Sequence, residues 1–249
     1  MKQKNLCRAG AAALALTLTV TLCQPAFAAT KADFSKDETI YAVMAADGSV
    51  TSTTVSEHLY NAGGLSKVED KSTLKNIQNT ESFAEYTQNG DTLVWNTDDT
   101  DVYYKGDTDR PLPISAKVTY TLDGRTAPLS ELLGQSGHLT IKIDLTNNDT
   151  GTVTADGKER TIVTPLVTAV GVVLGEDASN VDAVHGLLES AAKSSVAAFV
   201  ALPGVKDSLS GLLPQQVNGI EDYLQDSVTV EADVKDLTAP QIMIASAAS

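Results

Sequence analysis

The sequence predicts a mainly β protein, with antiparallel hairpins followed by a sandwich-like, Ig-like β domain and little helix. Apolar residues recur at every second position in several segments, a pattern typical of antiparallel strands that bury only one face. X-Gly dipeptides separate many of these segments, and such dipeptides accept the positive φ angles of tight turns. Helical periodicity is scarce, so we expect little helix.

The clearest alternation falls in three segments of the second half of the chain. Between their apolar residues stand Thr, Ser, Lys, Glu and Asp, which we expect to face water. The residues expected to face a core are Ile114, Ala116, Val118, Tyr120 and Leu122 in the first segment, Leu139, Ile141, Ile143 and Leu145 in the second, and Val228, Val230, Ala232 and Val234 in the third.

Two hairpins are predicted in the first half of the chain. Each consists of two alternating segments joined by an X-Gly turn, which is a strong short-range hairpin signal. The first pairs residues 40–45 with 50–59 around Asp47-Gly48, and the second pairs residues 83–88 with 92–96 around Asn89-Gly90.

One short helical turn is expected over residues 128–133, where Gly134 would end it. Residues 182–202 are ambiguous. Apolar residues from Val184 to Ala191 fit a helical face, whereas the run over residues 196–202 is typical of a short buried strand that ends before Pro203-Gly204.

Residues 1–28 have the pattern of a signal peptide. Three basic residues precede an uncharged, largely apolar stretch over residues 9–22, and Ala26-Phe27-Ala28 forms an A-x-A cleavage site. The apolar stretch is shorter than the about 20 residues that a membrane-spanning helix needs. We therefore expect cleavage before Ala29 and secretion of the mature chain; the alternative is an uncleaved N-terminal anchor.

Removal of the leader changes the composition. The full chain has 249 residues, two cysteines and a net charge of −14, whereas residues 29–249 keep 15 basic and 32 acidic residues, a net charge of −17, and no cysteine. An acidic chain of this kind disfavours nucleic acid and anionic membranes as partners. No apolar segment long enough to span a membrane follows the leader, and the mature chain cannot use disulfides or a catalytic thiol.

The chain divides into two expected units. Residues 97–113 are rich in Asp, Gly and Pro, a composition typical of a connection between folded parts. We expect a small hairpin-rich β unit over residues 29–109 and a β-sandwich-like domain over residues 110–249.

Several segments together resemble a known group of proteins. They are residues 36–43 with Ala46-Asp47-Gly48, residues 69–77, residues 91–96, residues 102–106, and Leu112-Pro113 leading into residues 118–124, with residues 130–134 and Ser136-Gly137. The chain is similar over most of residues 36–245 to the N-terminal extracellular region of Gram-positive surface proteins, loosely called YhgE/Pip-like. The resemblance implies strands over residues 161–174 and 196–202, and thereby favours strands for the ambiguous segment.

In those proteins, Leu/Gly heptad repeats and a late membrane segment follow the similar region. This chain has neither before its last residue, Ser249. We therefore expect either a natural short form or part of a longer membrane-anchored protein.

No motif in the sequence predicts an enzyme. The three histidines, at 58, 138 and 185, are far apart and show no zinc-binding spacing. There is no G-x-S-x-G nucleophile motif and no phosphate-binding glycine loop. The sequence predicts no cofactor except for the calcium hypothesis that follows.

An acidic cluster is the one candidate metal site, because carboxylate oxygens are the ligands that calcium prefers. The EF-hand register fails here, so the alternative is a solvated acidic loop. The candidate ligands are Asp98, Asp99, Asp101, Asp107 and Asp109.

Aromatic residues near the same loop form a candidate ligand platform, made of Trp95, Tyr103 and Tyr104. Exposed aromatic faces can stack on sugars. The alternative is core packing, since Leu93 and Trp95 share one strand face. On a strand, one of the adjacent Tyr103 and Tyr104 must face outward.

The function predicted from the sequence is a secreted, non-enzymatic extracellular or cell-surface interaction or structural module. Its partner would be a protein or a glycan. The alternative is a secreted carbohydrate-active protein, either a glycan-binding module or a glycoside hydrolase, which would use paired carboxylates.

Overall fold

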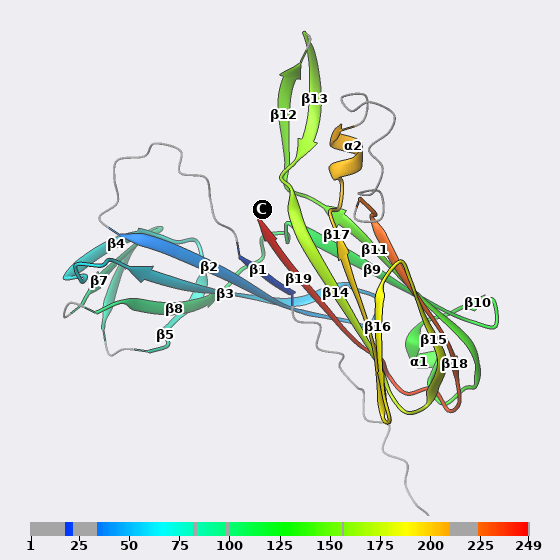
Figure 1. Ribbon diagram of the computed structural model, residues 1–249. Helices are drawn as coiled ribbons and strands as arrows, with labels where there is room; N and C mark the ends of the chain where they lie inside the picture. Colours follow the sequence, from blue (N-terminus) through cyan, green and yellow to red (C-terminus); the bar gives the residue numbers. More distant parts are fainter. Residues whose placement is uncertain are drawn as a thin grey trace, which may run out of the picture.

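The computed structural model describes residues 18–21, 34–81, 84–97, 100–155, 157–209 and 224–248 of the chain. These residues form strands in four sheets, with two short helices. Figure 1 shows a β-sandwich on the right and a smaller unit on the left, joined by the long strands β2 (Ser35–Met44) and β3 (Val50–Tyr60). The mainly β class predicted from the sequence is confirmed.

The largest sheet has nine strands and runs through both parts of the molecule (Figure 1). All pairs of neighbouring strands in it are antiparallel except β1 and β19, which run parallel. The spatial order is β16 (Leu187–Ala191), β17 (Ser194–Ala201), β14 (Leu166–Leu174), β19 (Gln241–Ala248), β1 (Leu18–Thr21), β2, β3, β8 (Val102–Asp107) and β5 (Lys75–Asn79).

A five-stranded antiparallel sheet forms the other layer of the sandwich. Its order is β10 (Arg125–Thr126), β9 (Ile114–Leu122), β11 (Gly137–Asn147), β18 (Ser227–Val234) and β15 (Ala178–Val184). Inward-facing residues of both sheets form one hydrophobic cluster, here called the large core. Every residue predicted to face inward from β9, β11 and β18 is buried except Ala116, which is half-buried.

Two smaller sheets and two short helices complete the described structure. The elements are the three-stranded sheet of β4 (Lys67–Lys71), β7 (Thr92–Asn96) and β6 (Tyr86–Asn89), the two-stranded sheet of β12 (Thr150–Ala155) and β13 (Lys158–Val163), and helices α1 (Leu129–Leu132) and α2 (Val205–Leu209). Neither helix has the length or the apolarity to cross a membrane, and the rest of the described chain holds no such helix.

A second hydrophobic cluster, here called the small core, lies between the three-stranded sheet and strands β3 and β8. The separation of apolar residues into two clusters matches the two-part appearance of Figure 1. Its buried members are Leu59, Leu65, Val68, Leu93, Trp95, Val102 and Tyr104.

Both predicted hairpins are confirmed. The turn of the β2–β3 hairpin contains Gly48 at φ +89°, and a Cβ at this position would lie 2.3 Å from the backbone oxygen of Ala116. Glycine is therefore required both for its backbone conformation and for the close approach to β9. In the second hairpin β6 begins only at Tyr86, and Phe83 lies outside the described residues.

The ambiguous segment forms strands rather than a helix. Residues 182–202 contain the end of β15, all of β16 and all of β17. The strand implied over residues 161–174 is divided into β13 and β14, because Pro165 has no backbone N–H to donate to a sheet. The short helical turn predicted over residues 128–133 is present as α1.

The large core draws residues from both sides of the expected boundary near residue 110. Ile40, Ala42 and Met44 of β2 and Val55 of β3 pack in it together with the strands of the sandwich. The β2–β3 hairpin therefore belongs to both parts of the molecule, with one end in each core.

Candidate functional site

The inward face of the β2–β3 hairpin changes from apolar to charged between the two cores. On β3, Val55 packs in the large core and Leu59 in the small core, with Glu57 between them. On β2, Glu38 precedes Ile40 by two residues and shares its face, because side chains alternate with period two along a strand. Charged residues thus stand where the pattern would otherwise place apolar ones.

Four side chains form a largely buried polar group at this point, here called the junction network: Lys36, Glu57, Asp70 and Tyr104. The Lys36 ammonium lies 3.1 Å from Glu57 Oε1 and 3.0 Å from Asp70 Oδ2. The Tyr104 hydroxyl donates a hydrogen bond to Asp70 Oδ2. The side chains of Glu57 and Asp70 are only 3% and 6% exposed, so Lys36 offsets part of the cost of burying them.

The network perturbs the protonation of its members. Burial, with the nearby charge of Glu38, raises the pKa of Glu57 to about 7 despite the opposing effect of Lys36. Burial lowers the pKa of Lys36, but the two carboxylates outweigh it and raise that pKa overall. Burial and then Asp70 raise the pKa of Tyr104, so its phenol stays protonated.

One oxygen of the network has no hydrogen-bond partner. Among the buried side-chain atoms of the described residues, only Glu57 Oε2 and Trp95 Nε1 lack one. A buried carboxylate oxygen without a partner is costly when the group is ionised. The missing partner is consistent with burial as the main cause of the raised pKa of Glu57.

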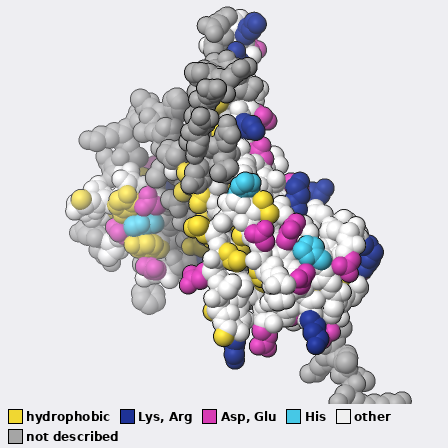
Figure 2. All heavy atoms as spheres, turned by 45° about the vertical axis from the view of Figure 1, so that its right-hand side comes forward, with side chains coloured by type: hydrophobic (Ala, Val, Ile, Leu, Met, Phe, Trp, Pro, Cys, Tyr) yellow, Lys and Arg dark blue, Asp and Glu magenta, His cyan; other side chains and the backbone are white. Residues whose placement is uncertain are grey.

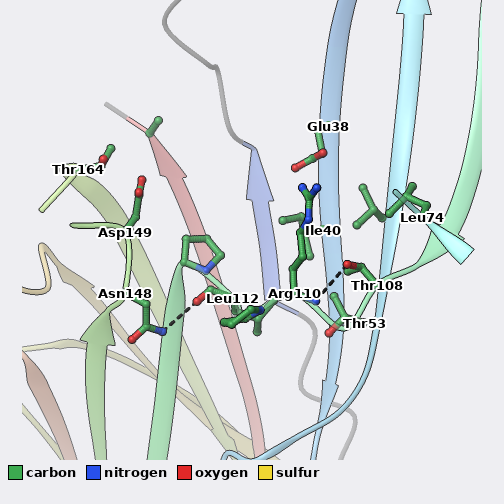
Figure 3. Close-up of a pocket in the computed structure, with 14 residues that line it drawn as sticks. Glu38, Ile40, Thr53, Leu74, Thr108, Arg110, Leu112, Asn148, Asp149 and Thr164 are labelled. Atoms are coloured by element: carbon green, nitrogen blue, oxygen red, sulfur yellow. Dashed lines mark hydrogen bonds between the residues drawn. The ribbon is translucent and has the colours of Figure 1, made fainter. Parts of the chain in front are cut away.

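A cleft of about 410 Å³ opens beside the junction network. Figure 3 shows Glu38 and Ile40 of β2 on one side of it, Asn148, Asp149 and Thr164 on the other, and Arg110 and Leu112 between them. The Arg110 side chain extends along the cleft toward Glu38 (Figure 3). The cleft thus lies at the same face of the hairpin as the network, on the side of the large core.

Backbone and side-chain hydrogen bonds fix the shape of the cleft. Arg110 donates from Nη2 to Thr73 Oγ1 at 2.7 Å, and its backbone N–H donates to Thr108 Oγ1 at 3.1 Å. On the opposite wall, Asn148 Nδ2 donates to the backbone oxygen of Leu112 at 2.9 Å. An anchored guanidinium above an aliphatic floor can pair with a carboxylate of a ligand.

Aliphatic side chains and prolines provide the apolar surface of the cleft, and no aromatic residue or histidine is among its described lining. The lining therefore offers no stacking platform for a sugar. It combines apolar walls with groups of both charges, which suits an extended polypeptide segment.

Two of the three aromatic residues predicted to bind a ligand lie in the small core. Trp95 and Tyr104 have no exposed surface, and their ring centroids are 5.2 Å apart. The interpretation of these two residues as an exposed platform is wrong, because they alternate inward with Leu93 and Val102 on β7 and β8. Both residues pack in the small core instead. Core packing was the alternative that the shared face of Leu93 and Trp95 indicated.

Tyr103 faces outward, as its position next to Tyr104 requires. It stacks on His58, with ring centroids 4.1 Å apart, and His58 also stacks on Tyr60 at 4.7 Å. The Nε2 atom of His58 lies 3.1 Å from Asp101 Oδ2. Figure 2 shows a histidine between hydrophobic side chains, with acidic ones around it, on the left where the small unit lies.

The three residues of the acidic cluster that the structure describes do not form one site. Asp101 contacts His58, Asp107 accepts a hydrogen bond from Asn76 Nδ2 at 2.9 Å, and Asp109 pairs with Lys75. Asp98 and Asp99 lie outside the described residues. Within the described part of the chain, no three His, Cys, Asp or Glu residues come close enough to hold a metal ion.

Glu57 and Lys36 were not identified from the sequence. The available signal was a charged residue in the inward register of an alternating segment, as with Glu57 between Val55 and Leu59. Arg110 lies at the end of the loop that the sequence singled out, but its role depends on contacts with Thr73, which is distant in the chain.

The chain matches no protein-family model, and a comparison with curated proteins finds no significant relative.

Proposed function

We propose that this protein is a secreted, non-enzymatic interaction module that binds a partner in the cleft beside the junction network. The observation that carries the proposal is the cleft itself, in which the anchored Arg110 and the carboxylate of Glu38 face an apolar floor. The signal-peptide pattern of residues 1–28 supports export and a role outside the cytoplasm.

The lining of the cleft supports binding rather than catalysis. Among the described residues around it there is no histidine or cysteine, which are the residues that most often serve as base or nucleophile in such sites. The groups of this region whose pKa is raised belong to the junction network, where Glu57 is buried and paired with Lys36.

Export is tested by expressing the complete chain with its own leader in a Gram-positive host. The mass of the protein recovered from the medium should correspond to a chain that begins at Ala29. A protein that stays with the cells, or one that still carries residues 1–28, would contradict this part of the proposal.

Binding is tested by selecting linear peptides from a display library on the secreted protein. We expect Arg110→Gln to weaken the selected peptides by about tenfold or more, because a charge-assisted hydrogen bond is lost. Lys105→Gln is the matched control, since Lys105 is an exposed cation on β8 outside the cleft. Equal binding by both variants, or a selection that enriches no peptide, would refute the assignment of the cleft.

The half-buried stack of Tyr60, His58 and Tyr103 on the surface of the small unit favours a second candidate function, glycan binding. Stacked aromatic faces with flanking carboxylates are a common arrangement in sugar recognition. On a glycan array, Tyr103→Ala should abolish any signal, whereas Tyr41→Ala should leave it unchanged because Tyr41 is an exposed tyrosine elsewhere, on β2. A signal that survives Tyr103→Ala would exclude the stack as its source.

A further inference from the structure

Strand β1 occupies a central position in the nine-stranded sheet. It pairs in parallel with β19, where residue 18 is opposite Ile244 and residue 21 opposite Ala247. On its other side it is antiparallel to β2, from Ala42 to Thr39. Among the strands that the structure describes, β1 alone connects β19 with β2.

Strand β1 also lies inside the segment that the proposed export would remove. Cleavage before Ala29 takes away residues 18–21 and leaves β2 and β19 facing each other across one vacant strand position. The inner edges of both strands would then carry unpaired backbone N–H and C=O groups. Such edges are templates for pairing with an added strand.

The neighbours of this position determine which strand fits it. Toward the large core, the flanking side chains are Ile40 and Ala42 on β2 and Ile244 on β19, all of them buried. Toward solvent, the flanking residues include the exposed Tyr41 and Ala245. A fitting segment therefore alternates, with apolar side chains inward and polar or small side chains outward.

We propose that the mature protein accepts at this position an extended strand donated by a partner polypeptide, with apolar residues at alternate positions. This inference rests on the proposed function and specifies its ligand. The strand would enter antiparallel to β2 and parallel to β19, in the place of β1. We call this vacant position the strand slot.

The strand slot leads directly to the cleft. The last residue of β1 lies beside Thr39 of β2 and Ala247 of β19. The next inward-facing residues beyond this point are Glu38 on β2 and Ala248 on β19, and both line the cleft. Figure 3 shows β1 ending between the two walls of the cleft. Residues that follow the donated strand would therefore pass Arg110 and Glu38.

The probe is a synthetic peptide with the sequence of residues 16–22, flanked by lysines for solubility. Its matched control has the same side chains but N-methyl groups at alternate residues, which block backbone hydrogen bonds along one edge. Binding to the secreted protein is measured by fluorescence anisotropy. Hydrogen exchange is followed at residues 39–42 and 244–247, with and without peptide.

We expect the peptide to bind, to raise the melting temperature, and to slow exchange in both segments. N-methylation should weaken binding by about fivefold for each hydrogen bond lost. A chain that retains its leader through Ala28→Asp should bind no peptide, because its own residues 18–21 fill the slot.

Three results would overturn the strand slot. The first is a secreted protein that begins at Ala29 and binds neither peptide. The second is equal binding of the peptide and its N-methylated control. The third is slow exchange at residues 39–42 and 244–247 before any peptide is added, which would mean that residues 29–33 or a second copy closes the position. In each case binding that depends on Arg110 would still support the proposed function, whereas retention of residues 1–28 would overturn the strand slot and the export part of the proposed function.

Discussion

Substitution of Glu57 by Gln should change the pH dependence of stability more than stability itself. Glutamine keeps the size of the side chain and an oxygen that can accept a hydrogen bond from Lys36. It removes the titrating group whose pKa burial raises to about 7 in the folded protein, from 4.5 in an unfolded chain. The variant therefore isolates the linkage between protonation of this one carboxyl and folding.

The sign and size of the effect follow from that difference in pKa. Because the folded state holds the proton more tightly, Glu57 contributes stability that is fully present below pH 4.5 and is lost as the pH rises through about 7. The difference corresponds to a loss of at most about 3 kcal/mol in the free energy of unfolding across this range. Burial of the carboxyl group is the main source of this loss, and its Oε2 atom has no hydrogen-bond partner to offset that burial.

The assay is urea unfolding of the wild-type protein and the variant at several values between pH 4 and pH 8. The free energy of unfolding of the wild type minus that of Glu57→Gln should fall as the pH rises from 4.5 to 7.5 and level off above. Glu69→Gln is the control, because the Glu69 side chain on β4 is 64% exposed. The free energy of unfolding of the wild type minus that of this control should not change with pH. A difference for Glu57→Gln that does not vary with pH would refute the reasoning.

Three further predictions concern the core, a turn and an exposed histidine. Trp95→Ala should lower the free energy of unfolding by about 3–5 kcal/mol in urea titrations, because Trp95 is fully buried in the small core. Gly48→Ala should lower the free energy of unfolding by about 2–4 kcal/mol, since the new Cβ would meet the backbone of β9. Gly90→Ala, which has open space around it, should lower it by only about 1 kcal/mol. The hydrogen bond that the His138 ring donates to the Asp233 carboxylate raises the pKa of His138, so Asp233→Asn should lower that pKa in an NMR titration. The protonated pair is lost as the pH rises through the raised value.

Local pattern was sufficient to find most strands. In β11, residues 139, 141, 143 and 145 alternate with polar residues, and this period follows directly from burial of one strand face. The X-Gly turns located both hairpins, because positive φ at positions such as Gly48 restricts the residue type.

Pairing between distant strands could not be read from the same pattern. The sheet places β19 between β14 and β1, although residues 241–248 carry small residues such as Ala and Ser as well as Ile, and give only a weak alternating signal. Periodicity shows which face of a strand is buried but does not identify its neighbour. The candidate site depends on such pairings, because Lys36 on β2 meets Glu57 on β3 and Asp70 on β4.

The prediction of an aromatic platform failed for a related reason. Clustering along the sequence brought Trp95, Tyr103 and Tyr104 together, but the period-two rule sends neighbouring residues to opposite faces. Only Tyr103 reaches the surface, and its stacking partner His58 comes from the adjacent strand. Proximity in the sequence was therefore less informative than the register between β3 and β8.

The strand slot requires that the small unit stay attached to the sandwich when β1 is absent, and the contacts of the β2–β3 turn show how. The Tyr120 hydroxyl on β9 donates a hydrogen bond to the backbone oxygen of Ala46 at 3.0 Å, and the backbone N–H of Val118 donates one to the backbone oxygen of Asp47 at 2.8 Å. Ile40 and Met44 remain packed in the large core from their own strand. Because these contacts come from the five-stranded sheet and not from β19, they hold β2 in place on one side while its free edge stays available to a donated strand.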